Sequence, residues 1–169
     1  KVASGRYTVV VDPQNSVRLL SPLLSALSGA ALQQNNSFLR EKLGVKLFSD
    51  NVTLIDDPHV PKAFGSRWFD NEGVATIKRP VINKGVVETY FLDTYHASKM
   101  GLAPTISGPS RLVLAPGANN CEGMVSSLEK GLLITGFNGG NCNSSSGDFS
   151  FGIEGFLIEN GQRTQPVSE

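Results

Sequence analysis

The chain has 169 residues, and its 15 acidic and 15 basic side chains give a formal net charge of zero. A balanced charge without long runs of one sign argues against a nucleic-acid footprint or a membrane-surface patch. No stretch approaches the roughly 20 consecutive apolar residues of a membrane span, and the length suits one domain with its own core. We therefore expect a soluble single domain over residues 1–169, with no nucleic-acid or membrane partner.

The cysteine content points to a reducing compartment. Cys121 and Cys142 share no CxxC spacing, and a domain held together by disulfides would be richer in cysteine. The first five residues also lack the apolar core of a signal peptide. We expect two reduced thiols in a cytoplasmic protein.

The first third of the chain predicts one strand followed by helices. Residues 6–11, RYTVVV, are β-branched and aromatic and stop before a proline, which is typical of a strand. Apolar residues then recur every three or four positions over 17–32, which predicts a helix that Pro22 kinks or divides. A second short helix is expected over 37–44, with Ser37 as its N-cap and a glycine at its end.

The middle of the chain predicts strands around an irregular loop. Residues 52–55 form a short β-prone run, and a loop rich in proline and glycine follows it. Two further β-prone runs, 75–81 and 86–92, are joined by the turn NKG and predict a hairpin. A short helix is expected over TYHASKMG, with Thr94 as its candidate N-cap and Gly101 at its end.

The last third predicts strands, one helix and a closing hairpin. Asn119 or Asn120 is the expected N-cap of an amphipathic helix. Asn160 and Gly161 are residue types that tolerate the positive φ angles of a type I′ turn between two strands. Strands are expected at residues 111–114, 132–137, 155–158 and 162–167.

The order of these elements indicates the fold class. Helices gather early in the chain, whereas β-hairpins dominate later, and the pattern shows no regular alternation of strand and helix. We predict an α+β fold, with a largely antiparallel β-sheet and a few helices packed against it.

The histidines do not form a recognisable metal motif. His59 and His96 lie far apart in the sequence, and neither stands in an HExxH pattern. Folding would have to bring His59 together with Cys121 or Cys142 to build a zinc site, and no spacing supports that arrangement. The favoured interpretation is one loop histidine and one helix-surface histidine.

Two acidic clusters and a glycine-rich stretch have both functional and structural interpretations. The pair Asp56 and Asp57 and the triplet at 70–72 are candidates for binding a hard cation or for acid–base chemistry, but turn formation is favoured. The segment 136–148 contains the glycines of a candidate anion nest, yet it lacks the lysine of a phosphate loop. A flexible connection between strands is favoured there.

Five segments read, in order, TLIDDP, FDNEGV, GVVETYFLDTYHASKMG, GLLITGF and SGDFSFGIEGFLIENGQRTQPV. Together they resemble the C-terminal half of the TldD/PmbA family, also called modulator of DNA gyrase proteins, over residues 9–168. The resemblance implies a cytoplasmic two-subunit peptidase that acts in peptide maturation or degradation. It also implies further segments before and after this piece.

The same resemblance assigns the zinc to a different subunit. In this family the TldD-type subunit carries zinc through an HExxxH helix, whose place here is residues 23–33, LLSALSGAALQ, without histidine or glutamate. It implies a zinc-free PmbA-type subunit with no catalytic, cofactor-binding or metal-binding residue. We expect Leu24 and Leu27 to be largely buried, and His59 and His96 to stay too far from this helix to share a metal.

The implied partners are a TldD-type subunit or a second copy of the chain, and a peptide substrate. Two other functions stay open: a self-sufficient metal-dependent hydrolase that uses His59, His96 and the acidic loops, and a structural or gyrase-associated module. The zero net charge argues against the gyrase-associated module. The candidates for facing a peptide or a partner are Asn138, Gly139, Gly140 and Asp148.

Overall fold

The computed structural model describes residues 2–168, and its contacts divide the chain into two compact units. The first unit contains Lys1–Leu23, Gly117–Asn143 and Asp148–Glu169, and the second contains Leu24–Pro116 and Ser144–Gly147. Each unit has a four-stranded sheet of its own. The expectation of a single domain stays a prediction.

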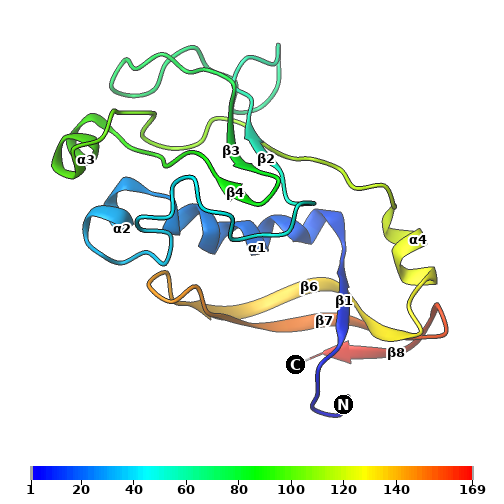
Figure 1. Ribbon diagram of the computed structural model, residues 1–169. Helices are drawn as coiled ribbons and strands as arrows, with labels where there is room; N and C mark the ends of the chain where they lie inside the picture. Colours follow the sequence, from blue (N-terminus) through cyan, green and yellow to red (C-terminus); the bar gives the residue numbers. More distant parts are fainter. Residues whose placement is uncertain (1, 169) are drawn as a thin grey trace. The chain divides into compact units, whose positions relative to one another are not determined.

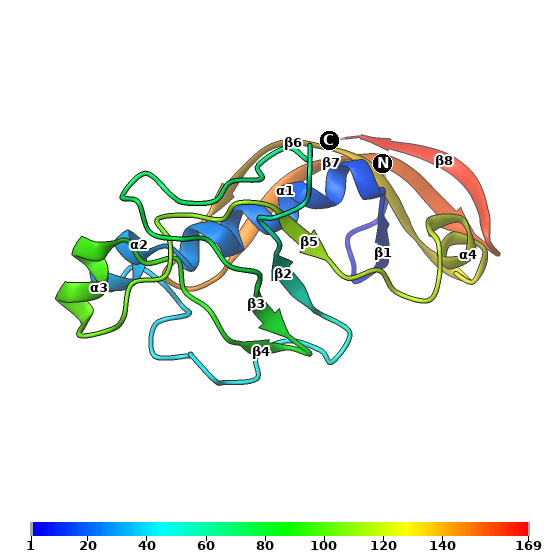
Figure 2. The same ribbon diagram turned by 90° about the horizontal axis from the view of Figure 1, so that it is seen from above.

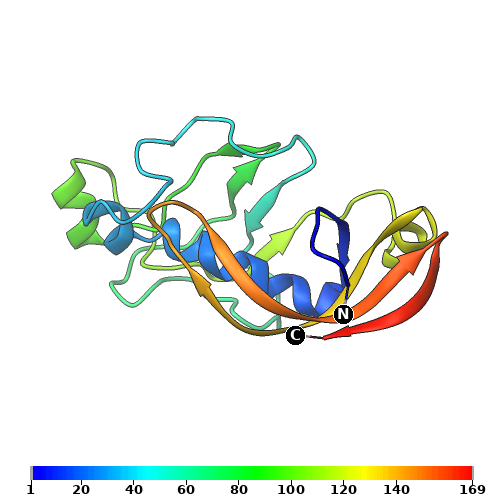
Figure 3. The same cartoon turned by 90° about the horizontal axis from the view of Figure 1, so that it is seen from below.

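The sheet of the first unit is built around one long twisted hairpin, visible in Figures 1 and 3. Its strand order is β1-β6-β7-β8, with β1 parallel to β6 and the other neighbours antiparallel. Asn160 at φ 51° and Gly161 at φ 74° form the closing turn, as expected for a type I′ hairpin. The strands are β1 (Thr8–Val11), β6 (Lys130–Cys142), β7 (Phe149–Glu159) and β8 (Gln162–Ser168).

Two helices of the first unit contact this sheet. The helix α1 (Pro13–Ala26) follows β1, and its Asn15 amide donates to the Thr135 carbonyl of β6 at 2.7 Å. The short helix α4 (Cys121–Ser126) is capped by Asn120, which accepts a hydrogen bond from the Gly123 amide. The core under α4 contains Val10, Val125, Leu133 and Ile158.

The helix predicted over 17–32 is divided, but not at its proline. Pro22 lies inside α1, and the chain breaks at Ser28 before α2 (Gly29–Gln33) begins. The Phe91 amide donates to the Leu27 carbonyl at 3.0 Å, and the Gly29 amide donates to the Phe91 carbonyl at 2.8 Å. Pairing with a distant segment therefore takes the backbone groups that a continuous helix would use.

The second unit has a smaller antiparallel sheet of order β4-β3-β2-β5, seen from above in Figure 2. Lys84 and Gly85, both at positive φ, close the predicted hairpin between β3 and β4. The helix α3 (Thr94–Met100) ends at Gly101 as predicted, but its N-cap is Asp93. The strands are β2 (Leu54–Asp56), β3 (Arg79–Asn83), β4 (Val86–Val87) and β5 (Leu112–Leu114).

Two local predictions in this unit are wrong. Residues 37–44 form turns because Glu41 has a φ of 60°, which a right-handed helix does not accept. The Ser37 hydroxyl accepts the Leu39 amide and donates to the Ala26 carbonyl, but no helix follows it. The strands predicted over 75–81 and 86–92 are also shorter than expected. The fold class is confirmed as α+β, with two mostly antiparallel sheets.

Candidate functional site

The position that the family resemblance assigns to a zinc helix is filled by packing. Leu27 and Leu32 are 0% and 1% exposed, so both side chains belong to the core of the second unit. Leu24, in α1, is only half-buried, and its predicted burial is wrong to that extent. The polar side chains of the segment are serine hydroxyls and the Gln33 amide, which do not suit zinc as imidazole, thiolate or carboxylate would.

His96 lies directly against α2. The expectation was that it would not come close enough to this helix to share a metal, and that expectation stays a prediction. A Cβ atom built on Gly29 would stand 2.8 Å from the His96 Cβ, so these two backbones approach as closely as a glycine permits. The His96 Nδ1 lies 2.8 Å from both carboxylate oxygens of Asp93. Since Gly29 offers no side-chain donor, the contact is packing and does not fit a shared metal.

Asp93 holds the start of α3 and orients this histidine. Its carboxylate accepts the His96 backbone amide at 2.7 Å, which is the capping bond of the helix. That backbone bond, together with the ring of His96, outweighs the effect of burial and lowers the pKa of Asp93. Asp93 thus caps α3 and bonds to His96, and the His96 side chain packs against Gly29 of α2.

His59 occupies the long loop before β3, as the sequence predicts. Its ring stacks on Trp68 with a centroid distance of 4.5 Å, and its Nε2 lies 3.1 Å from the Thr76 hydroxyl. Cys121 is half-buried and Cys142 is exposed, and both are free thiols. Among residues 2–168, no three histidine, cysteine, aspartate or glutamate side chains gather as a metal site would require.

The two acidic clusters hold loops together by accepting backbone amides. Asp56 is 0% exposed, and its Oδ1 accepts the amides of Ser110 and Arg111 at 3.0 and 2.8 Å. Among the residues described, its Oδ2 has no hydrogen-bond partner. The favoured interpretation, loop formation, agrees with this geometry.

Asp70 makes the larger set of bonds. Its carboxylate accepts the amides of Glu72, Val74 and Ser107 at 2.9–3.0 Å, although the residue is only 4% exposed. Burial raises the pKa of Asp70, but the backbone donors outweigh this effect and hold the pKa below its usual value. The motif FDNEGV thus contains a carboxylate that ties two loops together.

The loop secured by Asp70 carries exposed aromatic residues that the sequence analysis did not single out. Arg67 bonds the Ser110 hydroxyl and the Gly108 carbonyl at 2.9 and 2.7 Å, so the backbone of the loop is well held. Large apolar side chains nevertheless face solvent on it. They are Phe64 at 101%, Trp68 at 72%, Phe69 at 65% and Ile77 at 56% exposure.

The glycine-rich stretch is part of a strand pair rather than a flexible connection. β6 extends to Cys142 and pairs with β7 to Phe149, with an irregularity between Asn138 and Asn141. The segment is ordered because Arg18 donates to the Gly139 carbonyl at 2.9 Å and its guanidinium stacks over the Phe151 ring at 5.5 Å.

The four residues predicted to face a peptide or partner lie at this end of the hairpin. Asn138 donates to the Glu154 carboxylate at 2.8 Å, and the Asp148 carbonyl accepts the Asn143 amide at the same distance. Gly140, at φ 120°, lies against the ring of Phe151. All four residues are exposed, and their role in binding a peptide or partner stays a prediction.

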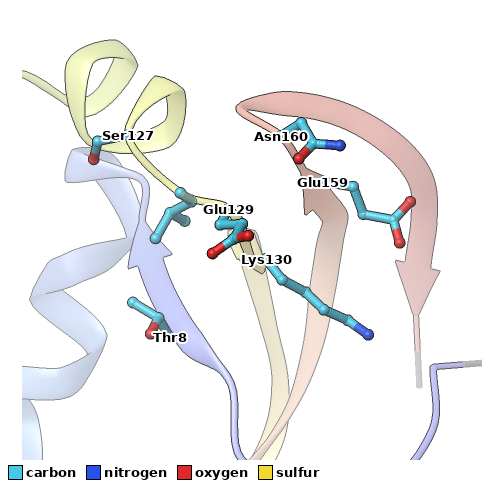
Figure 4. A pocket seen from close by; sticks show the side chains of 7 residues that line it. Thr8, Ser127, Glu129, Lys130, Glu159 and Asn160 are labelled. Carbon is cyan, nitrogen blue, oxygen red and sulfur yellow. The ribbon is translucent and has the colours of Figure 1, made fainter.

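The first unit has an open polar depression of about 720 Å³ at the start of β6, shown in Figure 4. Thr8 of β1 forms one wall, Lys130 and Glu159 come from β6 and β7, and Asn160 comes from the turn after β7. Its charges alternate in sign, since Lys130 lies between two glutamates, so no single ligand charge is favoured.

The second unit has a smaller depression of about 430 Å³, which we call the Leu43 groove. Leu32 and Tyr90 form its floor, and Leu43 and Leu102 form exposed parts of its walls. Apolar side chains and the polar or charged side chains of Gln33, Arg40, Glu41 and Lys99 share its lining, and ligand sites combine these two kinds of surface.

A model of the PmbA/TldA metallopeptidase C-terminal domain matches residues 4–169. The chain belongs to the PmbA/TldD family. It is 31% identical to the metalloprotease PmbA of Escherichia coli O157:H7, covering 100% of this chain and 38% of that protein. It is 27% identical to a TldD homologue of Haemophilus influenzae, covering 83% of this chain and 32% of that protein.

A solved structure from Bacteroides thetaiotaomicron, described as a modulator of DNA gyrase, has the same fold. It superposes with a TM-score of 0.97 at 64% identity, covering 100% of this chain and 39% of that one. The PmbA/TldD chain described here thus spans about two fifths of the length of these relatives. In residues 2–168, no helix is long and apolar enough to cross a membrane.

Proposed function

We propose that this chain is the C-terminal domain of a PmbA-type, zinc-free subunit of a two-subunit cytoplasmic peptidase that matures or degrades peptides. Zinc and the hydrolytic chemistry belong to a TldD-type partner in this proposal, and this domain supplies a docking surface and part of the peptide-holding wall. The sequence identity is higher to PmbA than to the TldD homologue, at 31% against 27%.

The observation that carries the proposal is the contact between His96 and Gly29. A zinc helix at this position would need side chains that project from α2 with an open coordination position. Here a β-carbon on Gly29 would already come within 2.8 Å of His96, and Leu27 and Leu32 are fully buried. The local packing therefore supports a structural helix.

The test is to purify the full-length protein alone and after co-expression with the TldD-type subunit of its own organism. We expect the two proteins to elute as one complex whose zinc and peptidase activity both depend on the TldD-type subunit. Two variant complexes show which subunit carries the activity. In one, the glutamate base of the TldD-type subunit is replaced by glutamine, and in the other this chain carries His96→Ala. The first should be inactive, whereas the second should stay active if it folds.

The competing hydrolase is tested by the same material. Stoichiometric zinc in the full-length protein alone, lost in a His59→Ala, His96→Ala double variant, would overturn the proposal. Elution as two separate proteins at micromolar concentration would overturn the assignment of a TldD-type partner.

A further inference from the structure

The Leu43 groove combines a rigid apolar floor with partly exposed apolar walls. Leu32 and Tyr90 are 1% and 3% exposed, whereas Leu43 and Leu102 keep 47% and 40% of their surface in water. The Tyr90 hydroxyl donates to the Leu39 carbonyl at 2.5 Å and accepts the Lys42 amide at 2.9 Å. Because both hydrogen-bonding roles of this hydroxyl are used, Tyr90 presents only its ring to the groove.

The rim of the groove carries two cations and one anion. Arg40 and Lys99 line it, together with Glu41. Arg40 and Glu41 are 3.4 Å apart with exposed side chains, and such a surface pair holds its members weakly. The Lys99 ammonium lies 5.7 Å from the centre of the Tyr95 ring. An incoming carboxylate would therefore meet two cations that are not committed to strong partners.

The backbone at the rim of the groove turns at Glu41. Glu41 has a φ of 60°, in a region that residues other than glycine seldom adopt. Turn residues elsewhere in the chain, such as Lys62 and Lys84, adopt similar angles, so at Glu41 the turn serves to place a charged side chain on the groove.

We propose that the Leu43 groove binds the C-terminal end of a peptide whose last residues are apolar. The terminal carboxylate pairs with Arg40 and Lys99, and the apolar side chains lie on Leu43 and Leu102. The inference names a substrate feature for the peptide role proposed above and rests on that role.

The rim chemistry favours a peptide over a free fatty acid. Glu41 can accept an amide N–H, and the exposed Gln33 amide can donate to a peptide carbonyl, whereas a fatty acid offers neither group. The volume of about 430 Å³ is at the lower end for small-molecule sites and suits one or two residues.

The experiment is isothermal titration calorimetry on the full-length protein with N-acetyl-Leu-Leu and with its C-terminal amide. We expect the free acid to bind about tenfold more tightly, since only it can form charge-assisted bonds to the rim. An Arg40→Gln, Lys99→Gln double variant should remove that preference and leave binding of the amide unchanged. Lys62→Gln, at an exposed lysine outside the groove, is the matched control and should keep the preference.

The apolar part is tested separately. Leu43→Lys should abolish binding of both ligands, whereas Leu114→Lys, at a leucine of similar exposure on β5, should change neither. Equal binding of acid and amide by the unaltered protein, or no binding of either, would overturn the proposal. If octanoate binds as tightly as the dipeptide acid, the proposal that the groove binds a peptide is overturned.

Failure here is distinguishable from failure of the proposed function. The titration needs no TldD-type subunit and no cleavage. If the complex forms and cleaves peptides while the groove binds neither ligand, only the proposal of peptide binding in the groove is overturned. Binding in the groove without complex formation overturns only the assignment of the partner.

Discussion

The two units hold their backbones in different ways. In the first unit, strand pairing runs along the β6–β7 hairpin, and side chains of α1 bond the carbonyls at its edge. In the second unit the strands have two to five residues, and carboxylates of Asp56 and Asp70 hold the loops between them. A unit with little sheet can still be ordered when buried carboxylates replace the missing ladder.

The largest expected effect is on the second unit. Asp70→Ala removes a charged acceptor from three backbone amides and should lower the free energy of unfolding by about 3–5 kcal/mol, because three hydrogen bonds to a buried carboxylate are lost at once. Urea denaturation of the full-length protein, followed by tryptophan fluorescence, measures this loss, since Trp68 lies on the same loop. Asp50→Ala, at an exposed pair with Lys46, is the control and should cost less than about 1 kcal/mol.

The same variant has a pH signature. The pKa of Asp70 is lowered in the folded state, so its contribution is present above the unfolded pKa of about 3.9 and is lost as the pH falls through the folded pKa. The stability gap between wild type and Asp70→Ala should therefore be constant from pH 5 to about 7 and narrow in acid. A gap that widens in acid would contradict the assigned role of the carboxylate.

Leu27→Ala should cost about 3 kcal/mol, as a cavity forms around a fully buried side chain. Leu24→Ala, three residues earlier and half-buried, is the natural comparison and should cost clearly less. Thermal or chemical denaturation of both variants measures the difference. Equal losses would show that Leu24 contributes more to the core than its exposure indicates.

Gly155→Ala tests how closely strands approach in the first unit. A Cβ atom at this position would lie 1.9 Å from the Leu133 carbonyl, so β6 and β7 must separate, at a cost of about 2 kcal/mol. Gly136→Ala, on the adjacent pair of the same ladder, meets only the flexible end of Glu154 at 3.3 Å and should be nearly neutral. Hydrogen exchange of the β6–β7 amides would locate the change.

The smallest effect is expected at the cap of α3. Asp93→Ala loses the bond to the His96 amide and should cost about 1 kcal/mol. Asp93→Asn keeps an oxygen acceptor and should cost less. Because the pKa of Asp93 is lowered in the folded state, the cost of Asp93→Ala should again shrink as the pH falls below about 4.

The accuracy of the sequence predictions differs between the units for a physical reason. The closing hairpin was predicted because Asn160-Gly161 tolerates positive φ at both positions, and β1 because its β-branched run is local information. The helix over 37–44 was wrong because Glu41 adopts a left-handed conformation that nothing in its neighbours encodes. The break at Ser28 was misplaced because its cause, Phe91, lies more than sixty residues away.

The candidate sites show the same division. The lack of histidine and glutamate over 23–33 could be read directly from the sequence, and the acidic clusters were assigned to loops. The contact of His96 with Gly29, the exposed aromatic loop and the Leu43 groove were not predicted. Each of them depends on segments brought together from distant parts of the chain.

The sequence by itself determined the α+β class, most strands, the two turns at positive φ and the family, because periodicity, turn chemistry and motif order are local properties. Only the tertiary structure decided where the early helix breaks, which carboxylates are buried, and which side chains meet in the groove. Burial and the partners of a backbone group depend on residues distant in the chain, and a single sequence does not state those distances.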